Sequence, residues 1–97
     1  MVSVKITQST NSGKKLMAVF IDDNGKKIKT THFGQAGASD FTKNKDPERK
    51  KLYLARHKAN ENWNDYKSAG SLSFHILWNK TTLSASIADY KTKFNLK

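Results

Sequence analysis

The chain has 97 residues, which is enough for one domain with a modest core and too few for two. Its formal net charge of +10 and pI of about 10.0 favour anionic partners, such as nucleic acid or an acidic protein surface. Cysteine is absent, which excludes disulfide frameworks, thiol nucleophiles and thiolate metal sites. We therefore expect a single compact domain over residues 1–97 with a negatively charged partner.

The first segment, MVSVKITQST, lacks the long apolar stretch of a signal peptide or a membrane span. We expect an intracellular protein that is not secreted and has no membrane span. Within this segment the apolar residues Val2, Val4 and Ile6 alternate with polar ones, and this period predicts a half-buried strand.

Two further strands are predicted around a tight turn. The stretch KKLMAVFID, residues 14–22, is apolar on both alternations, as in a central strand or one covered on both faces. Asn24-Gly25 then predicts a hairpin turn. The next strand, KKIKTTHF, places Lys27 and Lys29 together, and we expect these lysines on an open face.

Residues 34–46 read as a loop, and a helix follows in DPERKKLYLARHKANENW. Asp46 is the expected N-cap and Pro47 the first helical residue. An apolar stripe at helical spacing is expected to pack on the rest of the protein; it consists of Leu52, Ala55, Ala59 and Trp63. The helix is expected to end near Trp63.

Two helical segments complete the predicted fold. Ser71 is the expected cap of a short buried helix that includes FHILW, and Thr81 or Thr82 is the expected cap of the last helix. The last helix should close the core through Leu83, Ile87, Tyr90 and Phe94. The fold class is α+β: a three-stranded antiparallel β-meander followed by two or three helices packed on it.

The density of cations in the central helix is the main functional feature. Seven of the 18 Lys and Arg residues lie between Lys43 and Lys58. A ridge beside the apolar stripe combines residue types that bind phosphate, stack on bases and read base edges; it consists of Arg49, Tyr53, Arg56 and Asn60. Lys50, His57 and Lys58 are expected on the solvent side. The alternative is a solvated basic helix with Tyr53 packed against its own core.

Other sites have weaker support. Gly34 and Gly37 could bring backbone amides close to a phosphate, although a structural turn is the better interpretation. A one-metal nuclease site could combine histidines with nearby polar residues; its members would be His32, His57, His75, Asp40 and Asn60. We expect a satisfied, half-buried His75 instead, and no catalytic residue, metal site or cofactor. Trp63 and Trp78 are expected in the core, with base stacking as the alternative.

The blocks HFG, SDFT, ERKKLYLARHK, ENW and LWNK resemble a family of small uncharacterised basic proteins of large DNA viruses. The resemblance covers Thr31 to Phe94. It implies a viral setting, in the host cell or packaged in the virion, and it implies no role for any single residue.

The sequence therefore predicts a non-enzymatic, sequence-tolerant nucleic-acid-binding protein, with DNA preferred to RNA as the expected partner. The expected contacts are Lys27, Lys29, Lys43, Lys45, Arg49, Lys50, Tyr53, Arg56, His57, Lys58 and Asn60. One alternative is a virion-structural or protein-interaction module that docks an acidic protein or assembles with itself. The other is a small metal-dependent nuclease.

Overall fold

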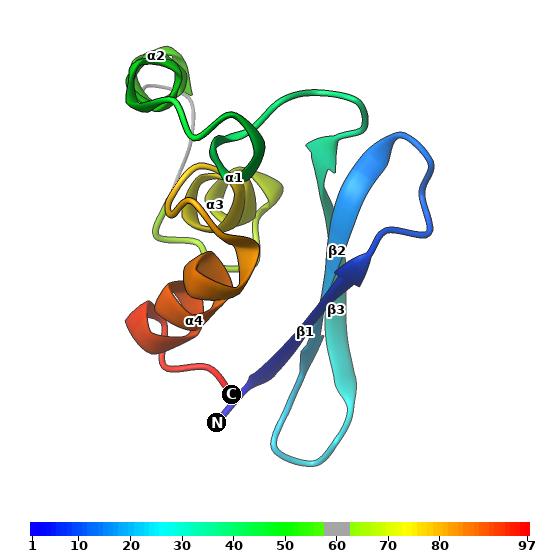
Figure 1. Ribbon diagram of the computed structural model, residues 1–97. Coiled ribbons are helices and arrows are strands. Elements are labelled where there is room, and N and C mark those ends of the chain that lie inside the picture. The colour runs from blue at the N-terminus through cyan, green and yellow to red at the C-terminus, as the bar shows by residue number, and fades with distance from the viewer. Residues whose placement is uncertain (58–62) are drawn as a thin grey trace.

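A computed structural model describes residues 1–57 and 63–97, and it consists of a three-stranded antiparallel sheet followed by helices (Figure 1). The strands are β1 (Ser3–Gln8), β2 (Lys14–Ile21) and β3 (Lys27–Gln35), in the sheet order β1-β2-β3. The helices are α1 (Phe41–Asn44), α2 (Pro47–His57), α3 (Ala69–Leu72), the π-helical segment η1 (Ser73–Leu77) and α4 (Leu83–Lys93). The predicted α+β class and the central position of β2 are confirmed. No helix in the described part of the chain has the length and apolar content that crossing a membrane requires.

The β2–β3 connection forms as predicted. Gly25 has a φ of 81°, which glycine adopts without a steric penalty, and its amide donates to the Asp22 carbonyl at 3.1 Å. The Asp22 carboxylate also accepts hydrogen bonds from the Asn24 and Lys26 amides, each at 2.9 Å. The turn is therefore held by its own polar groups.

The alternation of β3 differs from the prediction at one point. Lys29 lies opposite Phe20 of β2, whereas Lys27 lies opposite Ile21, because the register shifts there. Directly opposite residues on neighbouring strands share a face. Lys29 therefore shares the face of the buried Phe20, and Lys27 lies on the other face. The prediction that both lysines lie on one open face is wrong, because the extra residue in β3 reverses one of them.

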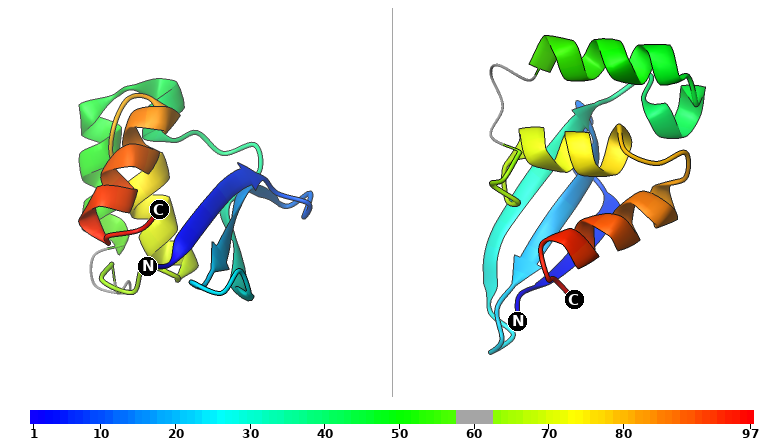
Figure 2. Two further views of the ribbon diagram at one scale, coloured as in Figure 1. Left: turned by 90° about the horizontal axis from the view of Figure 1, so that it is seen from below. Right: turned by 90° about the vertical axis from the view of Figure 1, so that its left-hand side faces the viewer.

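The core lies between the sheet and the helices, which cover one face of the sheet (Figure 2). Phe20 and Phe33 of the sheet are fully buried, as are Ile76 of η1 and Tyr90 of α4. The Tyr90 hydroxyl donates to the Tyr66 carbonyl, so the polar end of this buried ring is satisfied. Burial of these large side chains joins the two layers.

The predicted loop between β3 and α2 contains a short helix, α1, that the sequence analysis missed. Its cap is Asp40, which is 2% exposed and accepts from the Thr42 amide at 2.9 Å. The same carboxylate is 2.6 Å from the Lys15 ammonium of β2. One capping carboxylate, stabilised by a lysine from the sheet, is enough to order a single helical turn.

The short helix predicted around FHILW forms as α3 and η1, but its cap is different. The Ser68 hydroxyl accepts from the Ser71 amide at 3.1 Å and caps α3, whereas Ser71 is buried and donates to the Trp63 carbonyl. The expectation that Ser71 caps this helix is wrong, because the cap is Ser68, three residues earlier. Thr82 caps α4, which is one of the two predicted positions.

His75 is a satisfied buried histidine, as predicted. It is 3% exposed, and its Nε2 donates to the Trp63 carbonyl at 3.0 Å. Burial lowers the pKa of His75 below its ordinary value of 6.5, and the hydrogen bond to the Trp63 carbonyl offsets only part of this effect.

The C-terminal helix closes the core through a narrower set of residues than predicted. Tyr90 is fully buried, and Ile87 and Phe94 pack against the core. Leu83 is 37% exposed because it lies in the first turn of α4, so its predicted place in the core is wrong. After α4 the Lys97 carbonyl accepts from the Val4 amide of β1 at 3.0 Å.

We expect Tyr90→Ala to lower the free energy of unfolding by about 3 to 5 kcal/mol, because it removes a large ring from the core. Leu83→Ala on the same helix is the control, with an expected loss of about 1 kcal/mol or less because the side chain is partly solvated. Urea unfolding of both variants measures the difference. Equal losses would show that the burial along α4 is assigned incorrectly.

Stability should also fall as the pH drops below about 6.5, the ordinary pKa of histidine. In that range the unfolded chain binds a proton at His75 that the folded protein excludes, so protonation favours unfolding. His75→Gln keeps a donor for the Trp63 carbonyl and does not titrate. Thermal melts between about pH 7.5 and pH 5 should therefore decline less for the variant than for the parent. Parallel pH profiles would contradict this assignment.

Candidate nucleic-acid interface

Helix α2 starts as predicted but presents a different face to the protein. The Asp46 carboxylate accepts from the Glu48 amide at 3.0 Å, which confirms the predicted cap. Leu52 is 58% exposed and Ala55 is also exposed, so these two residues do not pack on the protein as predicted. The side of α2 that faces the rest of the protein instead carries Lys50 and Tyr53. The predicted end near Trp63 depends partly on residues 58–62, which lie outside the described residues.

The ring of Tyr53 connects α2 to the rest of the protein. It stacks on Trp78, with ring centroids 4.5 Å apart and planes 6° apart. On the same helix His57 stacks on Tyr53 with a centroid distance of 4.3 Å. The expectation of His57 on the solvent side is therefore wrong, and we call His57, Tyr53 and Trp78 the aromatic stack. This arrangement agrees with the alternative in which Tyr53 packs against its own protein.

Lys50 is the second connection between α2 and the protein. Its ammonium donates to the Asn79 carbonyl at 2.8 Å and lies 5.0 Å from the centre of the Phe41 ring. The predicted position of Lys50 on the solvent side is wrong, because this side chain reaches from α2 to the connection between η1 and α4 and to α1. Its charge is used within the protein and is less available to a ligand.

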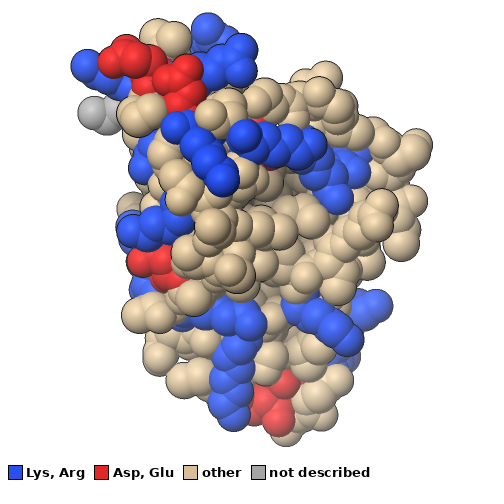
Figure 3. Space-filling model, viewed as in Figure 1, with Lys and Arg blue, Asp and Glu red and all other residues tan. Residues whose placement is uncertain are grey.

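The other cations of this region remain exposed. We call this group the basic surface; it consists of Lys43, Lys45, Arg49, Lys51 and Arg56. In the described part of the chain the ion pairs join Lys15 to Asp40 and the N-terminal ammonium to Asp23, and none of them includes the basic surface. Figure 3 shows Lys and Arg side chains over the upper part of the molecule, around α1 and α2, with acidic side chains beside them at the upper left, and further Lys and Arg side chains over the lower part.

A groove lies between α2 and the rest of the protein. Its first hollow has a volume of about 440 Å³ and is lined by Ser39, Arg49, Leu52, Arg56 and the aromatic stack. A second hollow of about 460 Å³ shares Ser39, Arg56 and the aromatic stack and continues to Lys14, Gln35 and α3. Because both hollows include the aromatic stack, the stack lies where they meet, and we refer to the two hollows together as the groove.

The lining of the groove carries an excess of positive charge. Arg49, Arg56 and Lys14 line it and are exposed. The acidic residue in the lining is Asp40, and the Lys15 ammonium lies against its carboxylate. Burial alone would raise the pKa of Asp40, but hydrogen bonds from Lys15 and Thr42, together with the lysine charge, lower it overall. Asp40 is therefore ionised at neutral pH, and its charge is compensated by Lys15.

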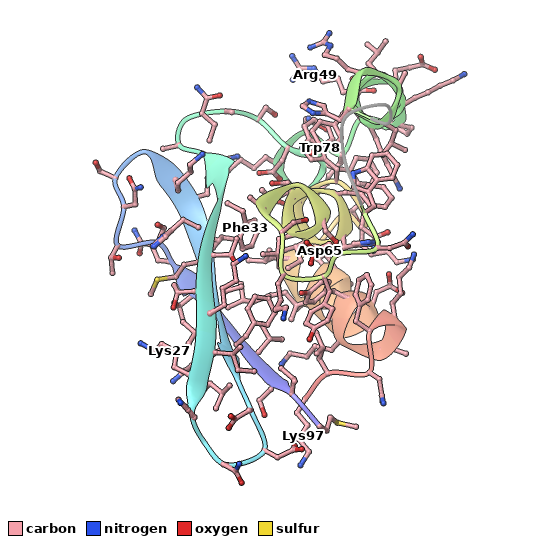
Figure 4. The ribbon with its side chains drawn as sticks, turned by 180° about the vertical axis from the view of Figure 1, so that it is seen from behind. Lys27, Phe33, Arg49, Asp65, Trp78 and Lys97 are labelled. Carbon is pink, nitrogen blue, oxygen red and sulfur yellow. The ribbon has the colours of Figure 1, made fainter. Side chains whose placement is uncertain are left out.

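The remaining predicted contacts lie elsewhere. Figure 4 shows Lys27 near the β2–β3 turn and Arg49 on α2, at opposite ends of the molecule, so the structure does not bring these two predicted contacts together. Lys29 is exposed on the same strand. Lys58 and Asn60 lie outside the described residues.

The alternative sites are not assembled in the described residues. The amides of Ala36 and Ala38 donate to the Gly13 and Gln35 carbonyls, so the glycine loop uses them within the protein. No group of three or more His, Cys, Asp or Glu residues that could hold a metal is found in the part of the chain that the structure describes. The histidines are separated: His32 bonds Ser9, and His75 bonds the Trp63 carbonyl.

Sequence reasoning missed Lys14, Ser39 and Leu52 as lining of the groove. No periodic signal connects Lys14 on β2 with a helix more than thirty residues later, since only the fold places them together. Leu52 was assigned to the core because of its helical spacing. Trp78 packs against the core, as expected, and also belongs to the aromatic stack. Trp63 stacks on Phe74 at 4.1 Å but is not part of the core cluster, so its predicted place in the core is wrong.

Comparisons with known proteins give two matches. A family of unknown function (DUF5754) matches residues 4–57, which include the sheet, α1 and α2. An uncharacterised protein of Acanthamoeba polyphaga mimivirus is 35% identical over 81 residues, covering 77% of this chain and 80% of that relative. No solved structure matches the chain. The viral relative supports the resemblance to a family of small viral proteins, while the basic character of that family stays a prediction.

We expect Tyr53→Ala to lower the free energy of unfolding by at least about 0.5 to 1.5 kcal/mol, the typical value of one aromatic pair. Tyr53→Phe keeps both ring contacts and should stay closer to the parent. Lys51→Ala, at an exposed position of the same helix, controls for changes in α2 that do not touch the stack. Chemical denaturation measures all three variants. A Tyr53→Ala variant as stable as Lys51→Ala would show that the stack does not hold α2.

Proposed function

The chain belongs to the family of unknown function DUF5754, and we propose that it is a sequence-tolerant nucleic-acid-binding protein whose basic surface on α1 and α2 contacts the phosphate backbone. One observation carries the proposal: five exposed cations lie on one short helical region, and no ion pair of the described residues neutralises them. Unpaired, solvated Lys and Arg side chains release counterions when they neutralise phosphates, and this release supplies affinity without reading the sequence.

The arrangement of α2 supports this function. The helix is attached through the aromatic stack and Lys50, which lie on its inner side. Arg49 and Arg56 lie on the exposed side and also line the groove. Arginine can donate two parallel hydrogen bonds to a phosphate, so this pair offers geometric recognition as well as charge.

DNA is the preferred partner in this proposal, because the relative is a protein of mimivirus and a viral setting offers a large genome to bind or package. The protein would then act in the infected cell or in the particle. The strand lysines Lys27 and Lys29 are a separate group of cations in this proposal, because they lie on β3 and Lys27 is far from Arg49 (Figure 4).

A protein-interaction role is the second candidate, and the exposure of Leu52 favours it. A leucine that is 58% exposed beside Arg49 and Arg56 could contact an acidic protein that also offers an apolar residue. The same face could mediate self-association. Binding of random-sequence nucleic acid that weakens steeply with salt distinguishes the first candidate from this one.

Arg49→Ala combined with Arg56→Ala should weaken binding to random-sequence DNA. The dependence of log K on log salt should become shallower by about 0.9 for each lost phosphate contact. Lys26→Ala combined with Lys27→Ala removes the same charge from the opposite end of the molecule and is the matched control. Fluorescence anisotropy titrations at several salt concentrations measure both.

The proposal requires the arginine variant to lose more affinity than the lysine control. Equal losses would show that net charge alone attracts the DNA. Absence of binding by the parent at low salt would refute nucleic-acid binding itself. Both double variants should keep the parental thermal midpoint, because all four side chains are exposed.

A further inference from the structure

In the groove beside the basic surface, aromatic and apolar side chains lie next to arginine. A site that binds only a phosphate does not require aromatic or apolar side chains. Its lining combines the aromatic stack and Leu52 with Arg49 and Arg56. We propose that the groove receives unpaired bases, so that the preferred ligand is a single-stranded nucleic acid. This inference rests on the proposed function and specifies the ligand of the same surface.

The shape of the groove agrees with one strand and not with a duplex. Each hollow has a volume of about 440 to 460 Å³, which is suitable for a single small planar group and its sugar. A duplex keeps its bases stacked inside and presents mainly phosphates and sugars to a concave surface. Placing a duplex base in the groove would require unpairing, which costs a few kcal/mol.

The chemistry of the lining agrees with bases. The rings of His57 and Trp78, which both stack on Tyr53, bring π surface to both hollows, and Leu52 adds apolar surface in the first hollow. Bases of any sequence bind to such surfaces, because every base has a π face. A sequence-tolerant interaction with unpaired bases therefore follows from the lining.

The charges lie where the backbone of a bound strand would run. Arg49 and Arg56 line the first hollow, and Lys14 lines the second. Asp40 is compensated by Lys15, so its carboxylate does not oppose an incoming phosphate. A strand that follows the groove thus passes from the arginines, over the aromatic stack, to Lys14. Positively charged grooves with aromatic contacts are the common solution for sequence-tolerant single-strand binding.

The test compares three labelled probes of about 12 residues at one salt concentration: oligothymidylate, a random-sequence duplex, and an abasic strand with the same phosphates. Electrostatics alone favours the duplex, because its charge density is higher. We expect oligothymidylate to bind at least about tenfold more tightly than the duplex and than the abasic strand. Fluorescence anisotropy gives all three affinities.

A pair of variants locates the bases in the groove. Leu52→Glu places a negative charge in the lining at a residue without a packing role, and Ala55→Glu places the same charge at an exposed position that lines neither hollow. Leu52→Glu should reduce oligothymidylate binding more than Ala55→Glu. Both are expected to keep the parental thermal midpoint, since both side chains are exposed.

The outcomes separate this inference from the proposed function. Equal affinity for the abasic strand and oligothymidylate, or tighter binding of the duplex, overturns the inference and leaves backbone binding in place. Equal effects of Leu52→Glu and Ala55→Glu also overturn it, because the bases would then lie outside the groove. Failure of all three probes to bind at low salt refutes the proposed function.

Discussion

The buried contact between Lys15 and Asp40 is the constraint on which the arrangement of the helices depends. Lys15 lies near the start of β2, and Asp40 ends the segment that leaves β3. Because Asp40 also caps α1, the ion pair fixes both the path of the loop and the first turn after it. Close to this point Gly34 has a φ of 78°, and a Cβ there would lie 2.7 Å from the Leu77 side chain. Asp40 is buried and Lys15 is its charge partner, so removal of Lys15 would leave a buried carboxylate unpaired, which is costly.

Helix α2 depends on that junction and contributes little to the core itself. None of its residues is buried, and its attachment comes from the aromatic stack and the Lys50 hydrogen bond. These localised contacts hold the helix and leave most of its cations exposed. A helix embedded more deeply would bury arginine at a high desolvation cost. The same arrangement leaves the groove open between α2 and the rest of the protein, so the sparse attachment and the proposed binding surface have one structural origin.

The cations of the proposed interface lie outside the core that stabilises the fold. The sheet and α4 bury Phe20, Phe33 and Tyr90, and stability comes from that contact. In the described residues the buried charged pair is Lys15 with Asp40, and it belongs to the junction. Substitutions on the basic surface can therefore change binding without changing the core. This separation makes the proposed function accessible to mutagenesis, because the parent fold can be kept in each variant.

The sequence by itself determined the strands and the longer helices but not α1, because alternation in β1, the turn at Gly25 and the cap at Asp46 are local signals. It also determined the positive charge and the clustering of cations near α2. The tertiary structure decided which faces pack. Helical spacing predicted Leu52 as buried, whereas stacking of Tyr53 on Trp78 turned Leu52 to solvent. The groove, which Lys14 and Arg56 both line, arises from residues far apart in the chain, and no local pattern encodes proximity at that separation.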